Sequence, residues 1–203
     1  MLKTLLFDVD GVLVIGEHWH KDLERTHGIT SDQLAPFFKG PFQACLVGKA
    51  DLKVELASVL PRVGWPYSVD AFVDYWFRQD ALTLNDPLLQ TVQCLRQGGV
   101  KCYLATQQER YRTNYILREM GFSALFDGMF SSVGTGYMKN DSRFFTSIIT
   151  TLDDCPAENI LFWDDTPVNV GTARSTGMVA EIYTSFADFQ AKTRSFLDDL
   201  FPV

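Results

Sequence analysis

Residues 3–14 read KTLLFDVDGVLV, an apolar run that ends abruptly at two carboxylates. Residues 5–7 (LLF) are typical of a buried strand, whereas Asp8 and Asp10 are poor strand formers. Two carboxylates this close together repel each other unless a positive charge lies between them. Gly11 then permits a tight backbone turn. The stretch therefore indicates a strand whose end delivers acidic groups to a site that binds a cation.

The bulk properties of the chain exclude several classes of protein. The chain has 203 residues, of which 46% are hydrophobic, enough for one sizeable core and a small accessory domain. The formal net charge is −7 and no run of lysine and arginine interrupts it, so we expect no nucleic-acid partner. No apolar run approaches the roughly 20 residues that span a bilayer, so we expect no membrane partner.

Cysteine usage and the N-terminus predict a cytoplasmic protein. The four cysteines are far apart and form no Cys-x-x-Cys motif, which is typical of reduced, largely buried thiols. The first residues carry one lysine and only a short apolar stretch before Asp8, which is not the pattern of a signal peptide. For the oligomeric state we expect a monomer or a weak homodimer.

Short apolar runs alternate with helical patterns along most of the chain. The runs that we expect to form strands are residues 3–9, 100–106, 159–163 and 178–183. Such continuously apolar runs are typical of strands buried on both faces of a parallel sheet. Helical spacing and capping residues predict helices at residues 109–120, 142–152 and 167–176. This alternation predicts an α/β fold with a doubly wound, Rossmann-like parallel sheet.

Residues 16–86 interrupt this alternation because they contain no convincing buried strand. The stretches compatible with helix are residues 20–27, 51–60 and 68–82. The segment is too long for a structureless loop, so we interpret it as a helical insertion. The aromatic stripe Phe72, Tyr75 and Trp76 is expected to lie in its own core. The predicted domains are an α/β core, residues 1–15 and 87–203, and a helical cap, residues 16–86.

Polar side chains follow several of the predicted strands. Ligands of open parallel sheets bind beyond the carboxyl ends of the strands. The side chains expected at that edge are Asp8, Asp10, Thr106, Lys139, Asp164 and Asp165. Carboxylates from the two ends of the chain would repel one another there, and a hard divalent cation relieves that repulsion. Oxygen ligands without cysteine or histidine favour Mg²⁺ over zinc, so Mg²⁺ is the predicted cofactor.

Four segments, in this order, resemble the motifs of the haloacid dehalogenase-like (HAD) hydrolase superfamily. They are FDVDGVL at residues 7–13, LATQ at 104–107, GYMKND at 136–141 and WDDTPVNV at 163–170. The insertion directly after FDVDG resembles the small helical cap of that superfamily. The similarity covers essentially the whole chain and implies a phosphatase-type member.

The resemblance implies a catalytic role for four residues. Asp8 would be the nucleophile that attacks phosphorus and forms an aspartyl-phosphate. Asp10 would protonate the leaving alcohol and then deprotonate the water that hydrolyses the intermediate. Thr106 would donate its hydroxyl to a phosphate oxygen, and Lys139 would neutralise the nucleophile and the transferring phosphoryl group.

The resemblance also implies the metal ligands. Asp165 would bind Mg²⁺ directly, and Asp164 would bind it directly or through water. The side chain of Asp8 and the backbone carbonyl of Asp10 would complete the implied set. Asn169, one helical turn after Asp165, would hold a water on the metal.

Substrate contacts are expected from the core and from the insertion. Gln107 stands where the family commonly has asparagine, which is expected to alter how the phosphate or the cap is contacted. Asn140 stands where proline is common, which is expected to change only loop stiffness. Lys49, in LVGKAD, is placed to reach a substrate anion from the insertion. The predicted substrate-binding set is Gly11, Thr106, Gln107, Lys139 and Lys49.

The superfamily carries out several reactions, so the resemblance leaves alternatives. A dehalogenase needs neither an acid at Asp10 nor Mg²⁺, and a phosphonatase needs a cap lysine, for which Lys49 is the obvious candidate. A sugar phosphomutase uses the same acid–base pair and is the alternative among enzymes. A phospho-accepting signalling domain or an inactive scaffold is the alternative of another class. We predict a Mg²⁺-dependent phosphatase whose partner is a small phosphorylated metabolite.

Overall fold

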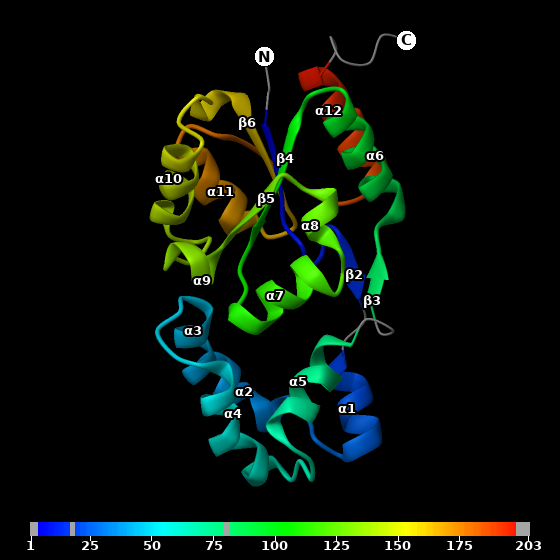
Figure 1. The fold of residues 1–203 in the computed structure, drawn as a ribbon, viewed down its shortest axis with the longest axis vertical. Coiled ribbons are helices and arrows are strands. Elements are labelled where there is room, and N and C mark those ends of the chain that lie inside the picture. The colour runs from blue at the N-terminus through cyan, green and yellow to red at the C-terminus, as the bar shows by residue number, and fades with distance from the viewer. Residues whose placement is uncertain (1–3, 17–18, 79–81, 198–203) are drawn as a thin grey trace.

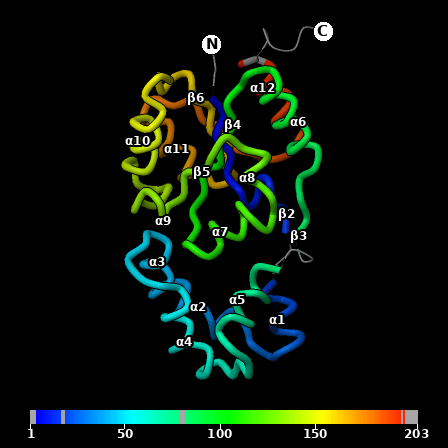
Figure 2. The backbone as a smooth tube through the Cα atoms, in the orientation of Figure 1, coloured from blue at the N-terminus to red at the C-terminus, as the bar shows by residue number. Residues whose placement is uncertain are grey.

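The computed structural model describes residues 4–16, 19–78 and 82–197. These residues form two lobes (Figures 1 and 2). The larger lobe holds the main sheet and both ends of the described chain, and the smaller lobe is built from helices that follow β2. Among the described residues, no helix is long and apolar enough to cross a membrane.

The larger lobe is organised around a sheet of five parallel strands. Across the sheet the strands are β5 (Gly128–Ser131), β4 (Lys101–Thr106), β1 (Thr4–Phe7), β6 (Ile160–Asp164) and β7 (Val179–Ile182). The predicted doubly wound α/β fold is confirmed, and the four predicted strands are present. The edge strand β5 was not predicted, because its short sequence GMFS begins with glycine and is only partly buried.

Alternate residues of the central strand β1 pack against helices on opposite faces of the sheet. Leu5 and Phe7 belong to the hydrophobic cluster on one face, and Leu6 belongs to the cluster on the other. The first face is covered by α6 (Asp86–Gln97), α7 (Arg110–Arg118), α8 (Phe122–Leu125) and α12 (Phe186–Leu197). The second face is covered by α10 (Ser142–Thr151) and α11 (Pro167–Ser175). Because both faces are covered, the three inner strands β4, β1 and β6 are predominantly apolar.

Short helical turns complete the larger lobe. They are α9 (Ser132–Thr135), directly after β5, and the 3₁₀ helix η3 (Ala157–Asn159), directly before β6. All four cysteines are free, Cys94 exposed and the other three buried.

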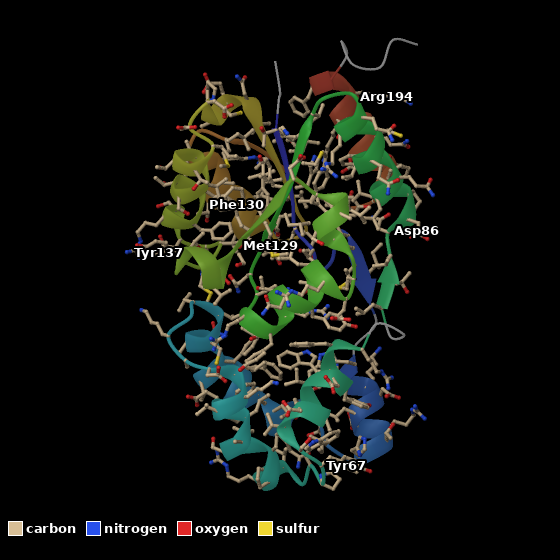
Figure 3. The ribbon with its side chains drawn as sticks, viewed as in Figure 1. Tyr67, Asp86, Met129, Phe130, Tyr137 and Arg194 are labelled. Atoms are coloured by element: carbon tan, nitrogen blue, oxygen red, sulfur yellow. The ribbon has the colours of Figure 1, made fainter. Side chains whose placement is uncertain are left out.

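The smaller lobe, here called the insertion, has its own hydrophobic core. Its helices are α1 (Trp19–His27), α2 (Ser31–Lys39), α3 (Pro41–Leu46), α4 (Leu52–Val59), η1 (Leu60–Val63) and α5 (Val69–Phe77). Leu23, Leu56 and Phe72 are fully buried in that core. Figure 3 shows Tyr67 at the end of the insertion that lies farthest from the sheet. Helix α2 was not predicted, since Pro36 lies inside it, but a capping box at Thr30 starts it.

A two-stranded ribbon joins the lobes and places a short, partly exposed strand within residues 16–86, where no buried strand was expected. β2 (Val14–Gly16) and β3 (Leu82–Leu84) pair antiparallel. Residue 82 therefore belongs to β3 and not to the preceding helix, which ends at Phe77; residues 79–81 of the predicted helix lie outside the described residues. The Asn85 amide donates to the carbonyl of Val12 at 2.8 Å and to the Tyr183 hydroxyl at 2.6 Å. The chain thus leaves and re-enters the larger lobe at one anchored point.

The insertion docks on α7, the helix that follows β4. Asp51, the residue that caps α4, forms an ion pair with Arg110 and accepts a hydrogen bond from the Tyr111 hydroxyl at 2.9 Å. The Lys53 ammonium lies 4.6 Å from the centre of the Tyr111 ring. These contacts hold the insertion over the carboxyl edge of the sheet, where the polar residues were expected.

Candidate active site

Three of the predicted side chains come from neighbouring strand ends. Asp8 follows β1, Thr106 ends β4 and Asp164 ends β6. The strand β1 pairs with β4 on one side and with β6 on the other, Phe7 lying opposite Leu104 and Trp163. Because all these pairs are parallel, the three side chains emerge at the same edge of the sheet.

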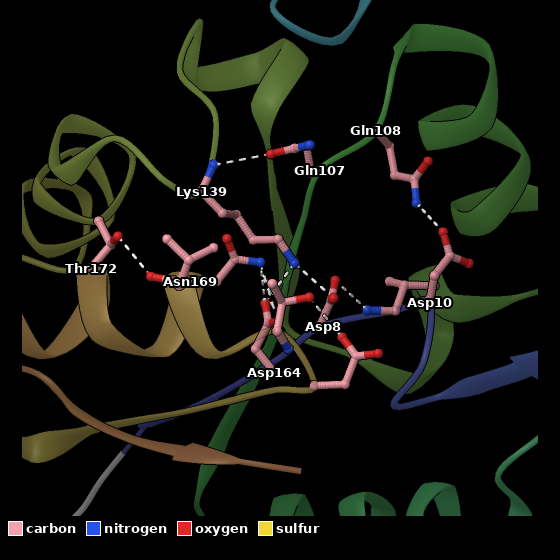
Figure 4. A network of polar contacts seen from close by, with 12 residues as sticks. Asp8, Asp10, Gln107, Gln108, Lys139, Asp164, Asn169 and Thr172 are labelled. Carbon is pink, nitrogen blue, oxygen red and sulfur yellow. Dashed lines mark hydrogen bonds and ion pairs between the residues drawn. The ribbon is translucent and has the colours of Figure 1, made fainter. Parts of the chain in front are cut away.

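Lys139 joins two buried carboxylates (Figure 4). Its Nζ lies 2.7 Å from Oδ2 of Asp8 and 2.7 Å from Oδ2 of Asp164, and all three residues are buried. The other oxygen of Asp8, Oδ1, accepts the backbone N–H of Val9 at 2.8 Å. The lysine therefore supplies positive charge between Asp8 and Asp164, which lie at the ends of neighbouring strands.

Burial and charge shift the pKa of both partners. Burial raises the pKa of Asp8 to about 7; Lys139 opposes this rise and Asp164 adds to it. Burial alone would lower the pKa of Lys139, but Asp8 and Asp164 outweigh it and raise that pKa. The ammonium stays charged, while the negative charge on Asp8 is costly enough that a further cation beside it is favoured.

The carboxylate of Asp164 is held in place by several hydrogen bonds and by the ion pair with Lys139. Its carboxylate accepts the Thr166 backbone N–H at 2.7 Å and the Asn169 amide N–H at 3.1 and 3.2 Å, in addition to Lys139. The structure places the amide nitrogen of Asn169 on Asp164, and the expectation that this residue holds a water on the metal stays a prediction. The first turn of α11 thus orients this carboxylate.

The acidic residues fit a divalent cation. Asp8, Asp164 and Asp165 each offer an oxygen, and these oxygens all lie within 4.8 Å of one another. A Cβ added at Gly11 would lie 2.1 Å from Oδ2 of Asp165, and Gly11 has a φ of +82°. Glycine is therefore required at this position, both for the turn and for the approach of Asp165. Three carboxylate oxygens without a nitrogen or sulfur donor suit Mg²⁺.

Thr106 presents a buried hydroxyl with no hydrogen-bond partner among the described residues. The residue is completely buried, and an unsatisfied buried hydroxyl costs about 1–3 kcal/mol. An anion oxygen bound in front of Asp8 would accept this hydrogen bond and remove that cost.

The side chain of Asp10 turns away from Asp8. It is 57% exposed, accepts the Gln108 amide N–H at 2.6 Å, and lies 3.6 Å from the guanidinium of Arg112. Neither partner was predicted from the sequence. Their only signal is position, since Gln108 directly follows LATQ and Arg112 lies in the first turn of α7.

Of the two remaining predicted residues, Gln107 contacts the site and Lys49 does not. The side-chain oxygen of Gln107 accepts the backbone N–H of Lys139 at 3.3 Å, which holds the lysine loop in place. Lys49 is exposed and lines neither of the clefts described below.

Two adjoining clefts open at this edge of the sheet. The first, here called the polar cleft, has a volume of about 490 Å³ and is lined by Asp8, Asp10, Gly11, Thr106, Gln107, Gln108, Lys139, Asn140, Asp165, Thr166, Val168 and Asn169. The second, here called the aromatic cleft, has a volume of about 560 Å³ and lies between the insertion and the larger lobe. The clefts share Asp10, Gly11, Gln107 and Gln108. One bound molecule can therefore extend from one cleft into the other.

Sequence comparisons identify related proteins. The family model "haloacid dehalogenase-like hydrolase" matches residues 2–177. Sesquiterpene phosphatase astK from Aspergillus oryzae is 42% identical over 189 residues, which cover 87% of each protein. Drimenol cyclase drtB from Aspergillus calidoustus is 30% identical over 95 residues, which cover 47% of this chain and 18% of that protein.

Structure comparisons identify similar folds. The HAD family enzyme bt-2542 from Bacteroides thetaiotaomicron, in a magnesium complex, has a TM-score of 0.78 at 17% identity, covering 95% of this chain and 98% of that chain. L-2-haloacid dehalogenase from Xanthobacter autotrophicus has a TM-score of 0.67 at 18% identity, covering 100% of this chain and 85% of that chain. At these identities the likeness extends to the fold alone.

Proposed function

Because the chain belongs to the haloacid dehalogenase-like hydrolase family and is a phosphoric monoester hydrolase, we propose that it is a Mg²⁺-dependent phosphatase acting through Asp8. The substrate is a small phosphorylated metabolite. The observation that carries the proposal is the Asp8–Lys139–Asp164 ion-pair group beside the unpartnered hydroxyl of Thr106. The proposal includes the domains predicted above, a core of residues 1–15 and 87–203 and a cap of residues 16–86.

The proposed reaction has two steps. An oxygen of Asp8 attacks phosphorus, the bond to the leaving alcohol breaks, and Asp10 gives that alcohol its proton. Asp10 then takes a proton from water, which attacks the aspartyl-phosphate, releases inorganic phosphate and restores Asp8. To reach the leaving oxygen, Asp10 exchanges its contacts with Gln108 and Arg112 for the substrate.

Positive charge at the reaction centre comes from two sources. Lys139 holds Asp8 in place and faces the phosphoryl group, and Thr106 donates to one of its oxygens. Asp8, Asp164 and Asp165, with the backbone carbonyl of Asp10, would hold Mg²⁺, which would supply further positive charge against the phosphate. The donor set supports this metal.

The relative that is 42% identical is named sesquiterpene phosphatase, and this supports hydrolysis of a phosphate monoester. A sesquiterpene monophosphate is therefore among the first substrates to assay. Phosphomutase activity and stable phosphorylation remain the alternatives, and monomer or weak homodimer remains the prediction for the oligomeric state.

The test measures release of inorganic phosphate from p-nitrophenyl phosphate. We expect turnover with Mg²⁺ and its loss with EDTA. The Asp8→Asn variant should lose activity by a factor on the order of 10⁴, whereas Asp153→Asn, at an exposed position outside both clefts, should retain it. Turnover that survives EDTA, or wild-type activity of Asp8→Asn, contradicts the proposal. Stoichiometric labelling of Asp8 without turnover would instead indicate a phospho-accepting domain.

A further inference from the structure

The aromatic cleft opens beside the reaction centre and is unused by the chemistry described so far. Its volume of about 560 Å³ lies in the range of pockets that enclose drug-sized ligands, about 300–1,000 Å³. It joins the polar cleft at Asp10, the proposed proton donor to the leaving group, and at Gly11. The alcohol that leaves from phosphorus is therefore directed toward the aromatic cleft.

The walls of the aromatic cleft are predominantly apolar. Four partly exposed aromatic residues of the insertion line it, Trp19, Phe38, Phe42 and Trp76. Other apolar lining residues are Val14, Ile15, Leu46, Phe77 and Leu82. A partly exposed aromatic surface at the mouth of an active site is a place where an apolar ligand removes hydrophobic area from water.

The charged groups of the cleft already have partners. Among the described lining residues there is no lysine, and the one arginine is Arg112. Its guanidinium lies 3.6 Å from Asp10 and donates to the carbonyl of Phe77 at 3.4 Å. The Glu109 carboxylate accepts the backbone N–H groups of Tyr111 at 2.7 Å and of Arg112 at 2.5 Å. A second phosphate or a carboxylate on the leaving group would find no uncommitted cation among these residues.

The rings around Trp76 are all tilted relative to its plane. Trp19, Phe38 and Phe42 have ring centres 5.3, 5.3 and 5.5 Å from that of Trp76, with interplanar angles of 33°, 83° and 53°. A flat base would need two parallel ring faces to lie between, and these tilted rings do not offer them. A three-dimensional aliphatic group contacts such a surface in any orientation, because its dispersion contacts are not directional.

We propose that the substrate is the monophosphate of an alcohol with a bulky aliphatic group, which occupies the aromatic cleft while the phosphate lies in the polar cleft. This inference deepens the proposed phosphatase function and rests on it. Phe38, Phe42 and Trp76 are then specificity-determining residues. Sugar phosphates and nucleotides are expected to be poorer substrates, because the uncharged polar part of the described lining is confined to His20, Gln43, Gln107 and Gln108, and many hydroxyl and amide groups would meet apolar walls.

The first test is a series of n-alkyl monophosphates from ethyl to octyl, each below its micelle concentration, with Mg²⁺. We expect kcat/KM to rise about fourfold per methylene until the cleft is filled. p-Nitrophenyl phosphate reports the phosphatase activity itself, and glucose 6-phosphate is the polar comparison. Hydrolysis of p-nitrophenyl phosphate with a flat alkyl series, or with glucose 6-phosphate turned over faster than octyl phosphate, overturns the inference and leaves the phosphatase proposal standing.

The second test separates binding from turnover. Titration calorimetry with n-alkylphosphonates, whose carbon–phosphorus bond a phosphatase does not cleave, should show the same fourfold gain in affinity per methylene. The heat-capacity change of binding should become more negative with chain length, as expected for burial of apolar surface. These trends without any hydrolysis would contradict the phosphatase proposal and support the hydrocarbon site. Affinities independent of chain length contradict the hydrocarbon site.

A matched pair of variants locates the effect. Ile15 lines the aromatic cleft and is 51% exposed, and Val54 lies on α4 outside both clefts and is 68% exposed. Because both side chains are largely exposed, Ile15→Gln and Val54→Gln should fold equally well. Ile15→Gln should reduce the octyl-to-ethyl ratio of kcat/KM about tenfold, and Val54→Gln should leave it unchanged. An unchanged ratio in Ile15→Gln contradicts the assignment of the hydrocarbon to this cleft.

Discussion

Around the reaction centre, the charged side chains are fixed by directed polar contacts; in the aromatic cleft, side chains are held mainly by apolar packing. Asp164 accepts from Lys139, Asn169 and a backbone N–H, and it comes from the end of a central strand. Trp76 comes from a helix of the insertion and packs on other aromatic rings. Reacting groups must keep their distances to within fractions of an ångström, which the sheet provides. Apolar contacts tolerate small displacements, so the insertion can vary without moving the reaction centre.

The largest expected effect concerns Asp10, which lies where the clefts meet. Asp10→Asn should reduce kcat for an alkyl phosphate by about 10²–10⁴-fold, because the leaving alcohol then receives no proton. The loss should be smaller for p-nitrophenyl phosphate, whose leaving group needs less protonation. The measurement is steady-state kinetics with both substrates, and Asp153→Asn is the control. Equal losses for both substrates would show that Asp10 supports the structure and does not transfer a proton.

Removal of the lysine charge tests how strongly the polar cleft depends on its ion pairs. Lys139→Met leaves Asp8 and Asp164 without their shared partner, so we expect a loss of about 3–5 kcal/mol in the free energy of unfolding. Lys101→Met is the control, since the side chain of Lys101 is 62% exposed and its pair with Asp127 is 3.4 Å long. That variant should lose less than about 1 kcal/mol. Urea denaturation in EDTA measures the free energy of unfolding of both variants. Equal losses would contradict the prediction that the buried ion pairs of Lys139 contribute more than the exposed pair of Lys101.

A pair of glycine substitutions separates backbone strain from the contact with Asp165. Gly11 and Gly64 have φ values of +82° and +83°, but a Cβ at Gly64 meets no atom within 4 Å. Both alanine variants should therefore lose about 1–2 kcal/mol of stability from the left-handed backbone. Only Gly11→Ala should also weaken Mg²⁺ binding, by about 10–100-fold in a calorimetric titration. Unchanged Mg²⁺ affinity in Gly11→Ala would argue against Asp165 as a metal ligand.

The smallest expected effect concerns Asp127, a reference residue at the end of the sheet opposite the clefts. Its carboxylate accepts hydrogen bonds from the Cys102 backbone N–H and from Arg96. Burial raises the pKa of Asp127, but the Cys102 N–H and Arg96 outweigh it and hold that pKa below 3.8. Its contribution is therefore present above about pH 4 and is lost as the pH falls through the folded-state pKa. Asp127→Asn should cost about 1 kcal/mol at pH 7 and less at pH 3. Chemical denaturation at each pH measures the difference in the free energy of unfolding between the wild type and this variant. A difference that grows as the pH falls would contradict a lowered pKa of Asp127.

Much of the larger lobe was predictable because its signals are local. Continuous apolar runs predicted β1, β4, β6 and β7, an apolar stripe predicted α10, and cap and stop residues predicted α11. Helices α6 and α12 were not predicted, and the strands that were missed depend on distant partners. The ribbon β2–β3 exists because residues 14–16 pair with residues 82–84, and the edge strand β5 is short and partly exposed.

The sequence predicted which residues form the candidate site better than it predicted how their side chains are oriented. The structure brings Asp8, Thr106 and Asp164 together at neighbouring strand ends, and Lys139 reaches Asp8 and Asp164 from the loop before α10, as expected from the sequence. It leaves Lys49 outside both clefts, because the position of an insertion residue depends on how the insertion docks. The aromatic stripe also divides, since Phe72 is completely buried in the insertion while Trp76 lines the aromatic cleft.

The sequence by itself determined which chemical groups follow which strands, since strand period, helix period and turn residues act over a few positions. Only the tertiary structure decided that Asp10 turns toward Gln108 and Arg112, and that Trp76 lines the aromatic cleft. Those outcomes depend on contacts between segments far apart in the chain. Their energies come from packing and charge partners that no local pattern records.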